Sequence, residues 1–375
     1  MRVLQICSAR ELGGGEKHVA ELANALSRRG HGVFAALIPA SPLLSELTAV
    51  PVNNILELPM RNALSVGSAL KLARFARENQ IEIIHAHMAR DYPLAALAAS
   101  RSGGIPLVLT RHVLFPLKKI HRLTLCRVAR VIAVSQAVAK VLHAQAIFDE
   151  RKLAVIHNGI DVEKFSRKQN ERASAETARG ENQERLRVGT IGHLGPIKGH
   201  DDFIRAAAII NSQRDDVDFI IAGEDKSRTG EHRRQIEKLI DDLGLGGRVF
   251  LSGWVDDVVH LLSTLDLLVS AARSEPFGLV IVEAMASGVP VVATMTAGAR
   301  EIIDADKTGL LAPIGDPEAL AAAICELLDD PKKRERLADD ARRMVSERFS
   351  LDRMITRTEQ VYQAVLGHHL SGANV

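Results

Sequence analysis

Short apolar runs alternate along the chain with longer segments in which apolar residues recur roughly every three to four positions. The first two runs, 2–7 and 31–38, enclose a segment of helical spacing over 16–30. Runs of this length predict strands, and the alternation predicts βαβ units. The runs are apolar throughout, which is typical of strands in a parallel sheet that helices cover on both faces. The alternation continues through the runs 81–87, 105–110, 130–135 and 152–159.

The alternation stops over 166–185, where the sequence SRKQNERASAETARGENQER has almost no apolar residue. A stretch this polar cannot contribute to a core, and we interpret it as a linker between two domains. Strand-like runs resume at residue 186, and three helical stretches close the chain, the last over 350–367. The pattern predicts an α/β chain with two Rossmann-like, doubly wound parallel-sheet domains over 1–165 and 186–349.

The composition agrees with two folded domains. The chain has 375 residues, of which 46% are hydrophobic and 25% charged, values near the average of soluble globular proteins. The cysteines Cys7, Cys126 and Cys325 lie far apart and predict neither a disulfide framework nor a zinc site, so we expect reduced thiols in a cytoplasmic protein. The first apolar run is too short for a signal peptide, and no run of about 18 uncharged apolar residues predicts a spanning helix.

Charge is unevenly distributed along the chain. The net charge of +2 gives no argument for a nucleic-acid partner, but no acidic residue lies between Asp91 and Asp149. Within this stretch, segment 111–130 mixes aliphatic and basic residues at roughly helical spacing. It is predicted to be either a helix on an anionic membrane surface or a core-facing helix with a basic polar side. The basic residues of the stretch are Arg101, Arg111, Lys118, Lys119, Arg122, Arg127, Arg130 and Lys140.

Glycines follow the first predicted strand. Parallel sheets bind ligands beyond the carboxyl ends of their strands, where Gly13, Gly14, Gly15 and Glu16 open a helix. Glycines let the backbone approach a phosphate or sugar, although a plain tight turn explains them equally well. The sequence is not GxGxxG, which disfavours a nicotinamide-dependent oxidoreductase.

Histidines end two predicted strands of the first domain. His85 and His87 close the run IEIIHAH, and His112 follows LVLTR. Imidazoles suit hydrogen bonding to hydroxyls and phosphates near neutral pH, and a structural role is the alternative. Of the first pair we favour His87, which is nearer the loop. Metal ligation lacks an accompanying carboxylate cluster.

Two further patterns lie in the second domain. The turn from Gly192 to Gly199 offers flexible backbone and Lys198, which suit a diphosphate unless the lysine is merely solvated. In SEPFGLVIVEAMASG, Phe277, Gly278 and Leu279 stand where a helix begins, with first-turn N–H groups that have no partner in the helix. Glu283 lies within this apolar helix and requires a partner, either a ligand hydroxyl or a structural salt bridge.

Together, the E-x7-E arrangement from Glu275 to Glu283, IGHLGPIKGHDDFI, AVIHNGIDVEKF and the GGGE turn resemble the family-four retaining glycosyltransferases, also called glycosyl transferases group 1. The resemblance covers nearly the whole chain. It implies the glycosyltransferase-B fold, in which two Rossmann-like domains face each other across a cleft and the closing helix, here 350–367, returns to the first domain.

The resemblance also implies residue roles for a nucleotide-sugar donor. Lys198 would neutralise the diphosphate, and His193 stands where the family commonly has arginine. Glu275 would bind sugar hydroxyls and Glu283 the ribose. His87 and His112 would line the sugar, and Val255 would lie in the loop that contacts the base. The remaining donor residues implied are Gly14, Gly15, Phe277, Gly278 and Leu279.

The implied reaction is retaining transfer from a nucleoside-diphosphate sugar, with UDP favoured, to a hydroxyl acceptor such as a lipid-linked or cell-envelope glycan. Stabilising the leaving diphosphate is the main task, and we expect no metal and no other cofactor. The DxD-like Asp304 to Asp306 lies in a polar turn and is predicted to be solvated. A nucleotide-sugar epimerase or phosphorylase of the same architecture and a non-catalytic sugar-nucleotide-binding protein are the alternatives. The expected location is the cytoplasm, at the inner face of the membrane where the acceptor is lipid-linked.

Overall fold

The computed structural model describes residues 1–60, 65–166 and 185–372. The chain forms two compact units, Met1–Gly159 with Leu351–Val375, and Ile160–Ser350. The first boundary falls a few residues before residue 165, where the sequence pattern places it. Most of the predicted linker, 167–184, lies outside the described residues.

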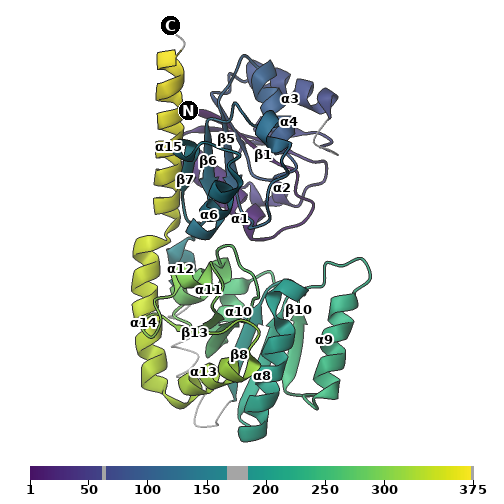
Figure 1. Cartoon of the computed structure of the whole chain (residues 1–375), viewed down its shortest axis with the longest axis vertical. Helices are drawn as coiled ribbons and strands as arrows, with labels where there is room; N and C mark the ends of the chain where they lie inside the picture. Colours follow the sequence, from purple (N-terminus) through teal and green to yellow (C-terminus); the bar gives the residue numbers. More distant parts are fainter. Residues whose placement is uncertain (61–64, 167–184, 373–375) are drawn as a thin grey trace. The chain divides into compact units, whose positions relative to one another are not determined.

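The first unit is built on a seven-stranded parallel sheet in the order β3-β2-β1-β4-β5-β6-β7 (Figure 1). Because the order reverses beside β1, the loops after β1 and β4 meet at a topological switch point. The strands are β1 Arg2–Cys7, β2 Gly32–Leu37, β3 Ile55–Glu57, β4 Ile83–Ala86, β5 Leu107–Arg111, β6 Arg130–Ala133 and β7 Leu153–Val155. The helices are α1 Gly14–Arg28, α2 Leu43–Glu46, α3 Val66–Glu78, α4 Tyr92–Arg101, α5 His121–Thr124, α6 Gln136–Gln145 and α15 Leu351–Gly372, with short turns η1 Val52–Asn54 and η2 Glu150–Lys152.

The second unit has a six-stranded parallel sheet in the order β10-β9-β8-β11-β12-β13. Its switch point lies between β8 and β11, so the loops after these two strands meet. The strands are β8 Leu186–Ile191, β9 Val217–Ala222, β10 Val249–Gly253, β11 Leu267–Ser270, β12 Val291–Thr294 and β13 Leu310–Ala312. The helices are α8 His200–Gln213, α9 Glu231–Asp242, α10 Val258–Ser263, α11 Leu279–Ala286, α12 Ala299–Ile302, α13 Pro317–Asp329 and α14 Pro331–Arg348, with the turn η3 Pro196–Lys198.

The inner strands of the first sheet, β2, β1, β4, β5 and β6, are mostly buried, as their unbroken apolar runs predict. Val3, Leu4 and Ile6 of β1 are all inaccessible to solvent. The closing helix α15 lies against this unit (Figure 1) and adds Met354 and Tyr362 to its core. Helices cover the sheet, as the apolar runs predict, and α15 at the end of the chain completes the core of the unit to which β1 belongs.

The prediction of a long basic helix over 111–130 is wrong. Only the four residues of α5 are helical there. Pro116 has no N–H to donate, and a residue before proline avoids helical dihedrals. The side chain of Gln145 also holds the backbone of Leu117 from both sides: its Oε1 accepts from the Leu117 N–H at 3.1 Å and its Nε2 donates to the Leu117 carbonyl at 2.8 Å.

Within the described ranges, no helix is both long enough and apolar enough to cross a bilayer.

Candidate active site

The loops at the first switch point are joined by a buried polar network. Asp91, which is 2% exposed, accepts a hydrogen bond from the Ser8 N–H at 2.8 Å and another from its hydroxyl. Arg90 Nε donates to the Ser8 hydroxyl at 2.7 Å. Burial raises the pKa of the Asp91 carboxyl, while the bonds from Ser8 oppose that shift. The network fixes the end of β1 to the loop after β4, which carries His87.

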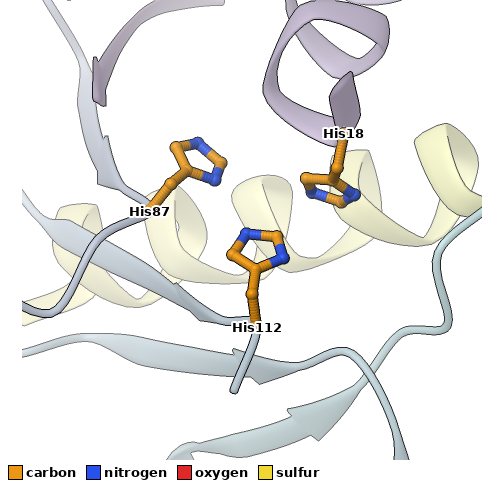
Figure 2. Close-up of side chains that lie close together, drawn as sticks. All are labelled: His18, His87 and His112. Atoms are coloured by element: carbon orange, nitrogen blue, oxygen red, sulfur yellow. The ribbon is translucent and has the colours of Figure 1, made fainter. Parts of the chain in front are cut away.

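Three histidines from three different elements point toward one another in the first unit (Figure 2). His87 follows β4, His112 follows β5 and His18 lies in the second turn of α1. One nitrogen from each ring lies within 4.8 Å of the others. His18 and His87 are buried, and His112 is half-buried. Burial lowers the pKa of His18 to about 4 and those of His87 and His112 well below the usual value, so the rings are neutral at pH 7.

The cluster carries buried nitrogens that have no hydrogen-bond partner within the described part of the chain. They are Nδ1 of His18, Nδ1 of His87 and both ring nitrogens of His112, whereas Nε2 of His87 lies 2.8 Å from the Gln5 side-chain oxygen. Buried polar atoms are nearly always hydrogen-bonded, so these nitrogens are available to a ligand that has several donors and acceptors. Sugar hydroxyls have that chemistry.

Among the described residues, the same three imidazoles are the group that could hold a metal ion. Neutral imidazole is a common zinc ligand, but zinc lies only about 2.0–2.1 Å from each nitrogen. The nitrogens, up to 4.8 Å apart, would have to approach one another for the three to bind one ion.

His85 is a structural residue. Its Nδ1 lies 2.6 Å from the Tyr362 hydroxyl and its Nε2 lies 2.7 Å from the Thr110 hydroxyl. Burial lowers its pKa to about 3. Both ring nitrogens of His85 are hydrogen-bonded within the core. Of His85 and His87, only His87 therefore has a ring nitrogen available to a ligand.

The sequence pattern did not identify His18. In α1 it lies on the same buried face as Leu22 and Leu26, one helical turn after the glycine turn that ends at Gly15. A histidine on the apolar face one turn after a glycine-rich strand end is the signal that could have found it.

In the second unit, two residues 77 positions apart form an ion pair. Lys198 Nζ lies 2.7 Å from Glu275 Oε2, and both side chains are mostly buried. Lys198 comes from the turn after β8 and Glu275 from the loop after β11, so the pair lies at the second switch point. The sequence patterns singled out both residues separately, and the fold brings them together.

The backbone that holds this pair requires glycine. Gly199 has φ +65°, and a Cβ at this position would lie 1.9 Å from the Ala271 carbonyl oxygen. The Arg273 N–H donates to the Ile197 carbonyl at 2.8 Å, and Arg273 forms ion pairs with Asp201 and Asp202. The turn after β8 is therefore fixed against the loop after β11 by close backbone approach and by charge.

Helix α11 begins beside this loop. Its N-cap is Gly278, with φ +109°, and Leu279 is its first residue, as predicted. A Cβ on Gly298 would lie 2.2 Å from the Phe277 carbonyl oxygen, so a second loop also approaches closely. First-turn N–H groups face away from the helix and favour an anion or hydroxyl. Glu283, one turn into the helix, is half-buried.

The other predicted residues lie at strand ends of the second unit. His193 follows β8 and is exposed, and Val255 follows β10 and is half-buried. Next to Val255, Trp254 is 41% exposed, with the Lys226 ammonium 5.6 Å from its ring centroid. Asp304 and Asp306 lie in an exposed turn, each 3.7 Å from a basic side chain, which agrees with the prediction of a solvated turn.

The fold is that of the glycosyltransferase-B class. The crystal structure of Alr3699/HepE from Anabaena in complex with UDP superimposes on 97% of this chain and 100% of that chain, with a TM-score of 0.84 and 24% sequence identity. The superposition therefore extends over both parallel α/β units of this chain.

The chain belongs to glycosyltransferase family four. Residues 12–164 match the model Glycosyltransferase Family 4, and residues 171–344 match Glycosyl transferases group 1. The N-acetyl-alpha-D-glucosaminyl L-malate synthase of Bacillus anthracis is 27% identical over 96% of both chains. LpsE of Rhizobium meliloti, a lipopolysaccharide core biosynthesis glycosyltransferase, is 29% identical over 90% of this chain and 92% of that protein. The protein is therefore a transferase of sugars.

Proposed function

We propose that the protein transfers a sugar, with retention of configuration, from a nucleoside-diphosphate sugar to a hydroxyl acceptor, and that the nucleotide is UDP. The observation that carries the proposal is the Lys198–Glu275 pair beside the first turn of α11. A cation, a carboxylate and helix N–H groups at one switch point suit a diphosphate and the hydroxyls of its sugar. The complex of HepE with UDP supports the choice of base.

The second unit binds the donor in this proposal. Lys198 neutralises the diphosphate, assisted by His193, and Glu275 accepts hydrogen bonds from sugar hydroxyls. Backbone N–H groups of Phe277, Gly278 and Leu279 surround the sugar and phosphates. Glu283 accepts from the ribose hydroxyls, and the loop at Val255 contacts the base.

In the first unit, the neutral rings of His87, His112 and His18 hydrogen-bond sugar hydroxyls, and the turn at Gly14 and Gly15 lets the backbone come close to the ligand. The bond between the anomeric carbon and the diphosphate oxygen breaks, and the acceptor oxygen bonds to the same face of that carbon. The hydroxyl proton passes to the departing phosphate oxygen. Charge stabilisation of the leaving group comes from the protein, without a metal or other cofactor.

A panel of nucleotides and nucleotide sugars in a thermal-shift assay tests the donor site, because a ligand that binds the folded state raises its apparent stability. UDP and a UDP-sugar should raise the melting temperature more than ADP or GDP. Slow hydrolysis of the UDP-sugar without acceptor separates a transferase from a mere binder, and formation of an epimeric UDP-sugar would identify an epimerase. Absence of any nucleotide shift would overturn the proposal.

The proposal places the acceptor at an anionic membrane on the cytoplasmic side, contacted by residues 111–130. Lys118, Lys119 and Arg122 are exposed on this segment, as are Phe115 and Leu123. Each basic residue near such a surface contributes about 1 kcal/mol. Flotation with vesicles of phosphatidylcholine and phosphatidylglycerol should recover the wild type and lose Lys118→Glu/Lys119→Glu. The matched variant Lys71→Glu/Lys332→Glu, on other exposed surfaces, should float like the wild type, and equal recovery of all three would contradict the contact.

A further inference from the structure

Helix α4 is apolar on two sides. Tyr92, Leu94 and Ala95 face the core, whereas Pro93 and Leu97 are half-exposed on the opposite side. The outer face consists of Pro93, Ala96, Leu97 and Ser100, which recur at the spacing of one helical face. A surface helix normally carries charged residues on its outer face, and a helix that is apolar all round is normally covered all round.

A cavity of about 540 Å³ lies along this outer face. Its other walls are Gly104 to Leu107 at the start of β5, Thr124 with Cys126 to Ala129 before β6, and Val66 at the start of α3. The volume is typical of a small-molecule site. The connection from β5 to β6, which lines part of the cavity, has only the four-residue α5, whereas a doubly wound fold usually has a full helix there. The outer face of α4 is thus only partly covered by the protein itself.

The charge at the cavity is of one sign. Arg127 belongs to its lining, and none of the lining residues is acidic. The Thr124 hydroxyl, also in the lining, is buried and has no hydrogen-bond partner among the described residues. The segment that closes the cavity also exposes Lys118, Lys119 and Arg122. An apolar cavity with a cation and an unpaired hydroxyl in its wall fits a ligand that has a hydrocarbon part and an anionic head.

Exposed apolar side chains lie on the same connection and in the cavity wall. Phe115 is 69%, Ile120 56% and Leu123 74% exposed, all on the connection between β5 and β6, and Val66 in the cavity wall is 56% exposed. Large exposed apolar residues interspersed with lysine and arginine are characteristic of surfaces that contact lipid. The connection that lines part of the cavity therefore carries side chains suited to a membrane surface.

We infer that this cavity binds the hydrocarbon chain of a phosphate-bearing membrane lipid, with Arg127 contacting the phosphate. The inference extends the membrane contact of the proposed function, on which it rests for its setting, and it requires no donor or transfer chemistry. The hydrocarbon chain of the lipid lies along Ala96 and Leu97 of α4, where a longer helix between β5 and β6 would otherwise pack. Arg127 and the Thr124 hydroxyl receive the head group.

Isothermal titration calorimetry of the full chain with dodecyl phosphate, kept monomeric, tests the site. Dodecyl phosphate should bind saturably with one equivalent per chain. Dodecanol, which lacks the charge, should bind roughly tenfold more weakly, and inorganic phosphate should neither bind nor compete. Competition by inorganic phosphate would show a simple anion site, and the absence of saturable binding would show an empty groove. Either result overturns the inference.

Substitutions locate the binding. Ala96→Trp fills the cavity with an apolar group that a helix tolerates, and it should weaken dodecyl phosphate binding at least tenfold. Leu97→Asp should do the same, whereas Leu70→Asp, the matched change on an exposed leucine of α3 outside the lining, should not. Arg127→Glu should weaken binding more than Lys71→Glu on α3. Wild-type affinity in Ala96→Trp, or equal loss in Leu70→Asp, would place the ligand elsewhere.

The UDP thermal shift, measured on each variant, separates the two proposals. Ala96→Trp should retain the wild-type UDP shift, which also shows that the variant is folded. If wild type binds dodecyl phosphate but no nucleotide, the donor proposal fails and the lipid site stands. If UDP shifts every variant and dodecyl phosphate binds none, including wild type, the lipid site fails alone.

Discussion

The two switch points have the same topology and opposite chemistry. In the first unit the loops after β4 and β5, together with α1, present three neutral imidazoles, two of them fully buried. In the second unit the loops after β8 and β11 present an ion pair, glycines and a helix start. Neutral rings suit hydrogen bonds with hydroxyls, which carry no charge, whereas a cation and N–H groups suit the negative charge of a diphosphate. One architecture thus provides two edges, and the residues at each edge determine which part of a substrate it suits.

The largest expected effect is the loss of the cation at the second edge. Lys198→Ala removes the positive charge and leaves Glu275 without its partner at 2.7 Å. Because Lys198 stabilises the leaving group in the proposed reaction, kcat should fall roughly 10²–10³-fold in a UDP-sugar transfer or hydrolysis assay. Lys198→Arg should recover part of the kcat, and Lys307→Ala, in an exposed turn, should have the wild-type kcat. A kcat within twofold of wild type would remove Lys198 from the chemistry.

A smaller effect is expected at the first edge. His112→Ala removes two ring nitrogens that have no partner among the residues the structure describes, and it should lower kcat about 10–100-fold, the range of one or two lost hydrogen bonds to a ligand. The UDP thermal shift should remain at its wild-type value. His85→Gln is the contrast, since His85 is bonded to Tyr362 and Thr110 and should affect stability rather than turnover. A lost UDP shift in His112→Ala would contradict the division of roles.

Acid should destabilise the first edge through its buried rings. The pKa of His18 falls from 6.5 to about 4 on folding, so the unfolded chain binds more protons between these values. The stability present above pH 6.5 is lost as the pH falls through about 4, and at about pH 5 the loss from His18 alone is about 2 kcal/mol. The free energy of unfolding, measured in urea above pH 6.5 and again at about pH 5, gives this loss. His18→Leu should reduce the loss and His143→Leu, at an exposed position, should not; equal pH dependence in all three would refute the assignment.

The smallest expected effect is that of chelation. In the proposed reaction Lys198 and helix N–H groups stabilise the leaving diphosphate without a metal, so EDTA should leave turnover unchanged. Activity that EDTA abolishes and only Mn²⁺ restores would show that the protein's own charges are insufficient.

The sequence predicted the architecture because buried parallel strands produce unbroken apolar runs, such as 2–7 and 186–191. It missed the edge strand β3, whose three residues Ile55–Glu57 are too few and too exposed to give a run. It also overestimated helix over 111–130, because spacing alone does not register Pro116 or the bonds from Gln145. Local patterns carry no information about partners that are distant in sequence.

The candidate site was predictable where residues follow strands, as Lys198, Glu275, His87 and His112 do. Their pairing was not, since the distance from Lys198 to Glu275 depends on strand order in the folded sheet. His18 was missed because a histidine in the middle of a helix resembles any other amphipathic position. Glu283, which the pattern places within an apolar helix, is half-buried.

Helix α15 determines the order in which the protein can fold during synthesis. Met354, Ile355, Tyr362 and Val365 belong to the core of the first unit, and the Tyr362 hydroxyl lies 2.6 Å from His85 in the central sheet. A ribosome that has made β1 to β7 has therefore not made a complete first core. The second unit, contiguous from Ile160 to Ser350, emerges whole before the first can close. The half of the chain that is synthesised first is the half that finishes folding last, and until then it depends on not aggregating.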